Sequence, residues 1–373
     1  MTLIETYHKY RVFAQRKKLS WITPSPLVNA VDNKSFNYSL EEPILREFGS
    51  YFSFTHPYRF STMQPCTRGA DIGRIKKGKT QNHLALFHIF PTAFSLSPNL
   101  EKINVYHRDA IFDTVDYLRA TGIDIRKLKV TYFSGGNLHD ISNGYVSVHK
   151  TFPADIVTLQ SFLEAGLENN QLVPLANLDT FVATFDGDED FLAGNRFEIY
   201  HPLSDNSALL EIATGESLKY RQVRRNKVTI DILPAPCCAT PVAIGLERLQ
   251  AILENRTSVR SISALTDIAD LLAPLLGSSA RKDKLIAADF FRAAHLVLAQ
   301  THKTRLNASI SEQRRVILSH LCRQSWNQDI LASNFLPVLR RNAALHPWLP
   351  ELADGAEIVA DLLIKNIERR RYS

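Results

Sequence analysis

Histidines, adjacent cysteines and an acidic run are the residues of this sequence whose types suit metal or thiol chemistry. His83 and His88 lie within an expected strand, whose two-residue period sends their side chains to opposite faces. Cys237 and Cys238 are adjacent, which is not a metal-ligand spacing, so two small buried residues are favoured. Residues 186–190 (DGDED) lack the glycine and terminal glutamate of a calcium loop, and we interpret them as an acidic turn. The sequence therefore predicts no metal site.

Familiar phosphate-binding and nucleophile motifs are absent from the sequence. The chain contains no Walker A loop, no GxGxxG, no GxSxG and no HExxH. One segment does combine cations with glycines, and its members are Gly69, Gly73, Arg74, Lys76, Lys77, Gly78 and Lys79. Such a composition predicts a mobile basic loop in front of the strand expected at residues 81–90.

Positive charge is concentrated at the C-terminal end of the sequence. The formal net charge is +6, and residues 281–373 alone hold 15 Lys and Arg against 9 Asp and Glu. This asymmetry is typical of proteins that bind a polyanion such as a nucleic acid. A solvated helical surface explains the same charges equally well, so both interpretations stay open.

The elements that must position these residues change character along the chain. Apolar spacing predicts a helix over residues 1–15, and prolines at 24 and 26 break it. Residues 81–90 (QNHLALFHIF) and 129–133 (KVTYF) have strand patterns, and residues 109–120 form an amphipathic helix that stops at Gly122.

Further strands are expected before an all-helical end. The candidates are residues 181–185, 197–201, 209–214 and 228–233. Prolines 234, 236 and 241 then predict a rigid segment, and Gly245 opens a helix (GLERLQAILE). From about residue 262 the patterns are almost only helical. The sequence thus predicts an α+β fold, with one domain at residues 1–260 and a helical, basic domain at residues 261–373.

Composition is ordinary for a globular protein, with 45% hydrophobic and 22% charged residues. No run approaches the ~18 apolar residues that a membrane helix needs, and the N-terminus lacks the pattern of a secretory signal. Four cysteines in a chain of 373 residues do not form a disulfide framework. We therefore expect a cytoplasmic protein with reduced thiols and no membrane partner.

Several segments, in order, resemble the alanyl-tRNA synthetase family, which belongs to the class II aminoacyl-tRNA synthetases. The resembling segments are residues 7–48, 64–68 (QPCTR), 78–90, 109–135, 197–200 (FEIY), 210–222, 233–249 (ending GLERL) and 284–299. The resemblance implies a catalytic core built on an antiparallel sheet flanked by helices, followed by a helical part that recognises tRNA. It also implies an adenylate-forming ligase that uses ATP and Mg²⁺ to activate an amino or other carboxylic acid.

The family's reactive positions are only partly kept. Its motif 2 arginine, which holds the α-phosphate, falls on Asn82, and a glutamate on the same strand falls on His88. Its tryptophan–asparagine pair falls on Ala213 and Thr214. No acidic residue occurs between Leu233 and Leu246, where the family has an aspartate that binds the substrate amine. An amide cannot supply the charge of a guanidinium, so these changes indicate a remodelled pocket.

Other positions match, and the resemblance assigns them to catalysis or nucleotide binding. The catalytic set is Arg68, Asn82 and His88. The cofactor-binding set is Arg68, Lys79, Arg248, Glu198 and Glu211. The resemblance gives Arg248 the role of stacking on adenine and reaching the γ-phosphate, while a surface ion pair with Glu247 or a neighbour is the alternative. We expect His88 to be a packed, hydrogen-bonded histidine that lines the pocket.

The helical part carries the expected nucleic-acid contacts. They are Arg314, Arg315, Arg340 and Arg341, with the terminal run 369–371 beside them. Asp289, Arg292 and Ala293 resemble the start of the family's tRNA-recognition part. The family's editing and C-terminal domains have no counterpart in the sequence, which predicts a specialised rather than a housekeeping ligase. A catalytically inactive relative that binds tRNA or a protein partner is the alternative.

Overall fold

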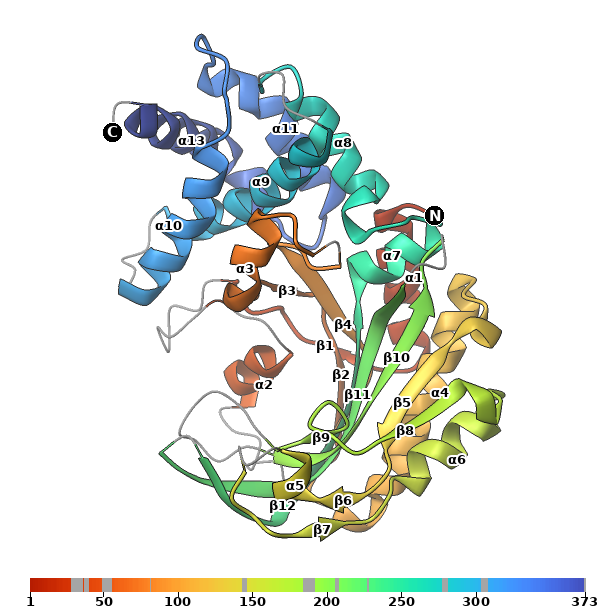
Figure 1. Cartoon of the computed structure of the whole chain (residues 1–373). Helices are drawn as coiled ribbons and strands as arrows, with labels where there is room; N and C mark the ends of the chain where they lie inside the picture. The colour runs from red at the N-terminus through yellow and green to blue at the C-terminus, as the bar shows by residue number, and fades with distance from the viewer. Residues whose placement is uncertain are drawn as a thin grey trace.

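The computed structural model describes residues 1–27, 36, 40–48, 56–80, 82–142, 146–183, 192–204, 208–226, 228–276, 281–302 and 308–371. These residues form a mixed α+β part followed by a helical C-terminal part (Figure 1). The α+β class predicted from the sequence is thereby confirmed. None of the described helices combines the length and apolarity that crossing a membrane requires. The acidic run at 186–190 lies outside the described residues.

Strands supply the centre of the molecule and helices surround it. The strands are β1 (Ser20–Trp21), β2 (Tyr58–Ser61), β3 (Gln64–Cys66), β4 (Phe87–Ser97), β5 (Lys129–Phe133), β6 (Gly136–Asn137), β7 (Thr151–Phe152), β8 (Leu172–Leu175), β9 (Phe181–Val182), β10 (Leu192–Pro202), β11 (Leu209–Arg225) and β12 (Val228–Gly245). The helices are α1 (Leu3–Arg16), α2 (Glu41–Phe48), α3 (Gly69–Lys76), α4 (Ile103–Thr121), α5 (Leu138–Ile141), α6 (Ile156–Glu164), α7 (Leu246–Leu253), α8 (Ser263–Leu272), α9 (Arg281–Thr301), α10 (Ala308–Cys322), α11 (Ala332–Leu345), α12 (Glu351–Asp354) and α13 (Ala356–Arg371).

Ten of the strands form one sheet in the order β1-β2-β4-β12-β11-β10-β5-β8, with β3 paired to β4 and β9 paired to β10. The central ladders from β4 to β5 are antiparallel. The outer pairs β1–β2 and β5–β8 are parallel. The sheet is therefore mixed, whereas the resemblance implied an antiparallel one.

The two faces of the sheet serve different purposes. Helix α4 packs against β4, β12 and β11, and α6 packs on α4. Alternation along the strands sends Phe90, Val242 and Ile244 to this helix-covered face, where they are fully buried. Ile89 and Ala243 fall on the opposite face, which borders a cavity.

Four elements confirm expectations from sequence. Helix α1 begins with a capping box made by Thr2 and Glu5, and α4 ends at Gly122 with φ +97°. Strand β5 has the predicted bounds, and Gly245 is the N-cap of α7. These elements are determined by caps and apolar spacing, which are local patterns that can be recognised in the sequence.

The strand expected at residues 81–90 begins later, as β4 at Phe87. The reason is a long-range contact, because the carboxylate of Asp289 accepts the backbone N–H of Ala85 at 3.0 and 2.9 Å. Leu86 donates to the same carboxylate at 3.5 Å. With these N–H groups satisfied by α9, the segment before β4 needs no strand partner. His83 therefore precedes the strand, and the expectation that both histidines lie on it was wrong.

We had expected the basic segment at residues 69–79 to be a loop. It contains helix α3 instead. Ile72 and Ile75 lie three residues apart and are buried against the core. Burial of this pair stabilises the helix despite the glycine inside it. Gly78, with φ +63°, then turns the chain away from the helix.

The proline segment, expected to be rigid, lies inside β12. Pro234 and Pro236 occupy the stretch where only β11 pairs with β12, so β12 is an edge strand there. Further along, the β11–β12 ladder passes over Thr240 and Pro241. The missing N–H of proline is therefore tolerated at each position.

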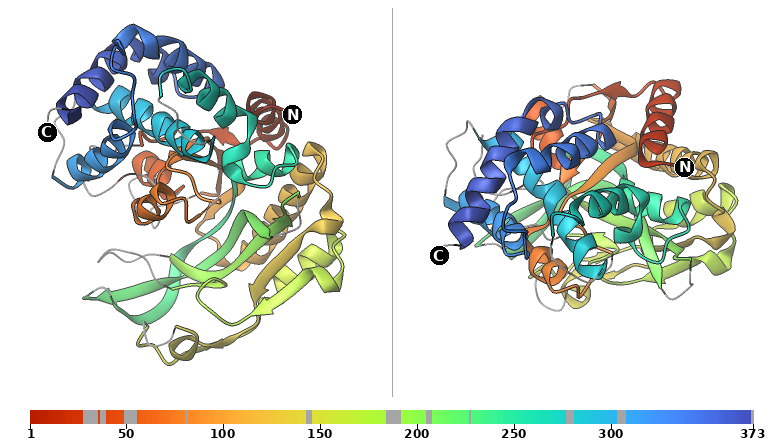
Figure 2. Two further views of the ribbon diagram at one scale, coloured as in Figure 1. Left: turned by 45° about the horizontal axis from the view of Figure 1, so that its top comes forward. Right: turned by 90° about the horizontal axis from the view of Figure 1, so that it is seen from above.

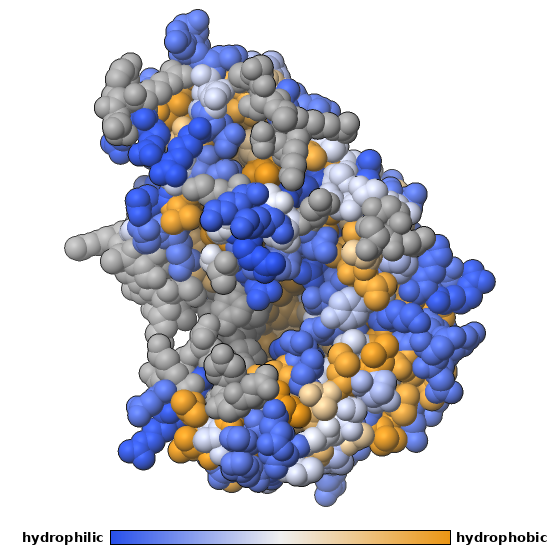
Figure 3. All heavy atoms as spheres, in the orientation of Figure 1, coloured by the Kyte–Doolittle hydropathy of each residue, from blue (hydrophilic) through white to orange (hydrophobic). Residues whose placement is uncertain are grey.

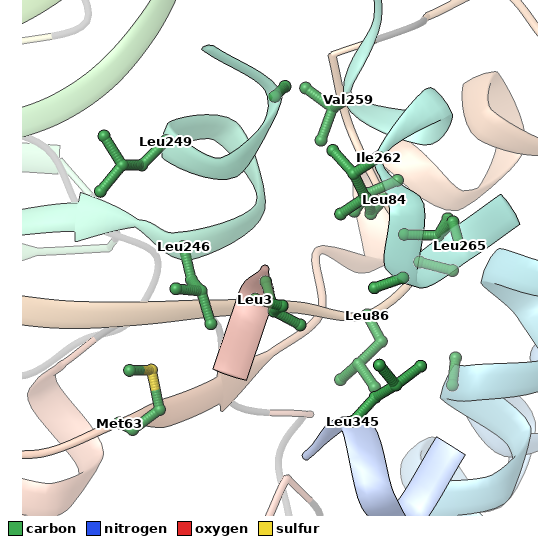
Figure 4. Packing of buried hydrophobic residues seen from close by; sticks show 14 of the residues in the cluster. Leu3, Met63, Leu84, Leu86, Leu246, Leu249, Val259, Ile262, Leu265 and Leu345 are labelled. Carbon is green, nitrogen blue, oxygen red and sulfur yellow. The ribbon is translucent and has the colours of Figure 1, made fainter. Parts of the chain in front are cut away.

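The helical C-terminal part shares its core with the sheet part. Leu84 and Leu86 from the segment before β4 converge with Leu246, Ile262 and Leu345 in one cluster (Figure 4). The helices lie over one end of the sheet in all views (Figure 2). The two parts share one continuous core, so the division into two domains at residue 260 remains a prediction from the sequence.

Candidate functional site

A cavity of about 520 Å³ lies on the sheet face opposite α4. The space-filling view shows a hollow there with apolar residues at its base (Figure 3). Strands β4, β12, β11 and β10 supply the floor, and the segments around α3 and α7 contribute to the rim. Five residues assigned from the sequence line the cavity, namely Arg68, Asn82, Glu198, Glu211 and Arg248.

Arg248 enters the cavity from the first turn of α7. Its Nη1 lies 2.9 Å from Oε2 of Glu211 and donates to the Glu211 carbonyl oxygen at 3.1 Å. Thr214 donates its hydroxyl to the other carboxylate oxygen of Glu211 at 2.8 Å. Burial acts to raise the pKa of Glu211, but Arg248 and Thr214 outweigh it and hold the pKa below its usual range. The carboxylate is therefore ionised and fixed beside the guanidinium.

A second charged group lies at the start of α3. Asp71 is within ion-pair distance of Arg68 Nε, at 3.4 Å, and of His83 Nδ1, at 3.2 Å. Burial lowers the pKa of His83 more than Asp71 raises it, so the imidazole is neutral near pH 7. Arg68 is more than half exposed, which leaves its guanidinium accessible to a ligand. No sequence pattern pointed to Asp71, because its place beside Arg68 depends on the turn into α3.

The third group lies on β10 and β11. Arg196 and Glu216 are opposite each other in the register, and both Nε and Nη2 of Arg196 donate to Oε1 of Glu216, at 3.0 and 2.8 Å. Glu198 accepts a hydrogen bond from the Tyr200 hydroxyl. Burial and the nearby charge of Glu211 raise the pKa of Glu198. Cross-strand partners of this kind become visible only when the strand register is known.

Two of the assigned residues lie outside the cavity. Lys79 is exposed after α3 and does not line the cavity walls. His88 is fully buried on the other side, so the expectation that it lines the pocket was wrong. The physical reason is its contact with Glu247, whose Oε1 is 2.8 Å from His88 Nδ1 and whose Oε2 accepts the His88 backbone N–H at 2.8 Å. The side chain is thereby held toward the helical part.

That contact belongs to a buried network that sequence reasoning did not find. Arg292 Nη2 donates to Glu247 at 2.7 Å and to His346 Nε2 at 3.0 Å. Burial acts to raise the pKa of Glu247, yet His88 and Arg292 outweigh it and lower the pKa to about 2. Burial and the Arg292 charge keep the pKa of His346 well below its usual value, so its neutral ring accepts this bond.

The same network contains a set of potential metal ligands. Nitrogen and oxygen atoms of His88, Glu247 and His346 lie within 4.8 Å of one another. The guanidinium of Arg292 already contacts two of the three, however, and supplies positive charge at this place. We therefore interpret the group as an ion-pair network that joins β4, α7, α9 and the end of α11.

A scan of protein-family models finds none that matches this chain, and a search of curated proteins finds no similar sequence. The geometry of the cavity therefore has to support any functional conclusion. Residues from strands β4, β10, β11 and β12 and from the segments around α3 and α7 meet there, which is the arrangement expected of a ligand site.

The arginines expected to contact nucleic acid lie on two helices of the C-terminal part. Arg315 is exposed on α10 and pairs with Glu312, while burial lowers the pKa of the half-buried Arg314. On α11 both Arg340 and Arg341 are exposed, and Arg341 pairs with Asp267. Asp289 and Arg292, by contrast, are fully buried and connect α9 to the sheet part. They hold the structure together and present no surface to a partner.

Proposed function

We propose that this chain is an ATP-dependent ligase that forms an adenylate of an amino or other carboxylic acid, as a specialised relative of the alanyl-tRNA synthetase core. The observation that supports this proposal is the meeting of Arg68, Asn82, Glu211 and Arg248 in one cavity. These residues come from segments that resemble separate motifs of that family. Their convergence is what a shared ancestral site requires.

In the proposed reaction, a carboxylate oxygen of the acid attacks the α-phosphorus of ATP, and the bond to the pyrophosphate leaving group breaks. An acceptor hydroxyl, that of tRNA in our proposal, then attacks the acyl carbon and AMP leaves. Arg248 and Arg68 line the cavity, and their side chains are 22% and 56% exposed. Their positive charge favours phosphate oxygens at which negative charge develops.

Mg²⁺ is expected with the nucleotide, and the donor set fits it. Glu211 presents an ionised carboxylate beside Arg248, and Mg²⁺ in nucleotide sites needs only one or two protein carboxylates besides the phosphates. Bound there, the ion supplies neutralisation of phosphate charge. Thr214 holds the Glu211 carboxylate in place through its hydroxyl.

The experiment is ATP–pyrophosphate exchange against a panel of amino and carboxylic acids, together with calorimetry of Mg-ATP binding. We expect exchange with at least one acid, and we expect Asn82→Arg to bind ATP more tightly by restoring a guanidinium at the cavity rim. Asn82→Gln, which keeps an amide and adds no charge, is the matched control. A folded protein that binds no ATP and exchanges with no acid contradicts the proposal.

An inactive tRNA-binding relative is the second candidate, and exposed arginines on α10 and α11 favour it. This candidate predicts tRNA binding that weakens with salt and is indifferent to ATP. Measuring tRNA affinity at two salt concentrations, with and without Mg-ATP, separates the two functions. Binding that strengthens in the presence of Mg-ATP and the acid favours the ligase.

A further inference from the structure

The cavity contains more carboxylates than cations. In three ion pairs of the cavity the charges of the two members cancel, namely Arg68–Asp71 at 3.4 Å, Arg196–Glu216 at 2.8 Å and Arg248–Glu211 at 2.9 Å. Glu198 and Asp179 also line the cavity, and among the described residues no cation lies within ion-pair distance of either. Glu198 accepts the neutral Tyr200 hydroxyl, and Asp179 accepts the amide of Asn177 at 3.3 Å. The β10 side of the cavity therefore has surplus negative charge.

The rest of the floor is apolar. Phe94, Leu192, Leu218 and Ala239 line the cavity and are nearly inaccessible to solvent, and together they belong to one apolar cluster. Pro241 and Ala243 continue this surface along β12. An apolar wall of this extent is favourable only for a ligand group that is itself apolar.

Strand registers place the charged and apolar parts next to each other. Glu198 lies opposite Thr214, which in turn lies opposite Ala243. Gly194 precedes Glu198 by four residues on β10 and lies opposite Leu218, which lies opposite Ala239. The apolar part of the cavity begins at these three residues. Four residues of a strand span roughly 13 Å between backbones. The charged and apolar parts are therefore neighbouring surfaces of one cavity.

We propose that the acid activated at this site is an amino acid with a large apolar side chain, whose ammonium group binds Glu198 with Asp179 nearby and whose side chain packs on Phe94, Leu218 and Ala239. The inference rests on the proposed ligase function and names its substrate class. An ammonium donates charge-assisted hydrogen bonds to a carboxylate and removes the surplus negative charge of the β10 side.

The β12 side of the cavity offers no partner for the ammonium. Strand β12 has no acidic residue between Val242 and Gly245, and its cavity-lining residues Ala239, Pro241 and Ala243 offer no charge. An ammonium over this strand would lose its hydration without a partner, which is costly. The side chain of the substrate therefore lies over β12 and the ammonium over β10.

The test compares acids that differ in one feature. Pyrophosphate exchange is measured with alanine, leucine and phenylalanine, and with 4-methylpentanoate and 3-phenylpropanoate, which lack the ammonium. We expect kcat/KM for leucine or phenylalanine to exceed that for alanine roughly 10- to 100-fold, as buried methylene groups provide. For the compounds without an ammonium, kcat/KM is expected to be lower by at least about tenfold than for the matching amino acid.

Two variants test the two parts of the cavity separately. Glu198→Gln keeps the size of the side chain and removes its charge, and it is expected to raise KM for leucine. Glu101→Gln, at an exposed position of the chain, is its control. Ala243→Leu reduces the space over β12 and is expected to shift preference toward alanine. This half-buried position accepts a larger side chain more readily than the buried Ala239 does.

The outcomes distinguish this inference from the proposed function. Exchange that is best with alanine, or equally good without the ammonium, overturns the inference and leaves the ligase in place. If no acid supports exchange, the ligase proposal fails, and calorimetry with leucine and phenylalanine in the absence of ATP decides the inference. Binding of either that Glu198→Gln weakens supports it, and no binding overturns it.

Discussion

Two consecutive residues of α7 belong to charged networks of opposite character. Glu247 points into the junction of sheet and helices, where it contacts Arg292 at 2.7 Å. Arg248 points into the cavity, where it contacts Glu211 at 2.9 Å. The distances are similar, but Glu247 and Arg292 are 2% and 0% exposed, whereas Arg248 and Glu211 are 22% and 32% exposed.

This difference in burial separates structural charge from functional charge. A buried pair has no alternative to its partner, because each charge alone in a low-dielectric interior is very costly. A partly exposed pair is screened by water and contributes little to stability, so either member is free to exchange its partner for a ligand. Geometry alone would give both pairs the same meaning, and their surroundings decide between them.

The largest effect is expected on removing Arg292. Arg292→Ala leaves Glu247 buried with less positive charge and should lower the free energy of unfolding by about 3–5 kcal/mol. Urea unfolding of wild type and variant measures this loss. The double variant Glu247→Leu/Arg292→Met removes both charges and should lose less than the sum of the single changes. Additive losses would contradict the coupling of the pair.

Asp289 provides the next largest effect, through pH. Burial raises its pKa to about 6, against an unfolded value near 3.9. A carboxyl group with a raised folded pKa contributes stability that is present below pH 4 and is lost as pH rises through 6. The difference in unfolding free energy between wild type and Asp289→Asn should therefore fall by about 2 kcal/mol from pH 4.5 to 6.5.

Wild type and Asp289→Asn share all other groups that titrate between pH 4.5 and 6.5, so the contributions of those groups cancel in the difference between the two unfolding free energies. Burial lowers the pKa of His295 to about 4, and such histidines change stability in the opposite direction. The Asn side chain still offers an oxygen to the N–H groups of Ala85 and Leu86. A difference that stays constant with pH would show that Asp289 does not titrate in this range.

Arg248 is expected to separate stability from binding. Arg248→Ala should change the free energy of unfolding by less than about 1 kcal/mol, because the pair with Glu211 is partly exposed. Its loss should weaken Mg-ATP binding by roughly 10- to 100-fold, the worth of a charge-assisted hydrogen bond. Calorimetry and urea unfolding measure the two quantities, and Arg126→Ala, on an 85% exposed side chain, is the control. A large loss of stability with unchanged ATP binding would place Arg248 with the structural charges.

The parts of this structure that the sequence predicted are those with local causes. The capping box at Thr2 and the αL residue Gly122 fixed the start of α1 and the end of α4. The start of β4 was wrong because its neighbouring N–H groups bond to Asp289, more than 200 residues later. No local pattern carries a contact of that range.

The site divides in the same way. Five lining residues were found because ordered motifs resemble a known family, which carries spatial information that periodicity lacks. Arg196, Glu216 and Asp179 were missed, since their approach depends on the register of β10 and on the turn before β9. His88 was placed in the pocket because the resemblance aligns it with a glutamate of the family, yet alternation along β4 sends its side chain to the other face.

The smallest effect is expected on the surface of α11, where two neighbouring arginines form a matched pair. Arg340 has no carboxylate within ion-pair distance among the described residues, whereas Arg341 pairs with Asp267. If tRNA contacts this helix, Arg340→Gln should reduce the slope of log affinity against log salt by about 0.7–0.9, the value of one phosphate contact. Arg341→Gln should reduce it less, because that guanidinium must first leave Asp267. Filter binding across a salt series measures both slopes, and equal slopes for wild type and Arg340→Gln would exclude this surface as the tRNA contact.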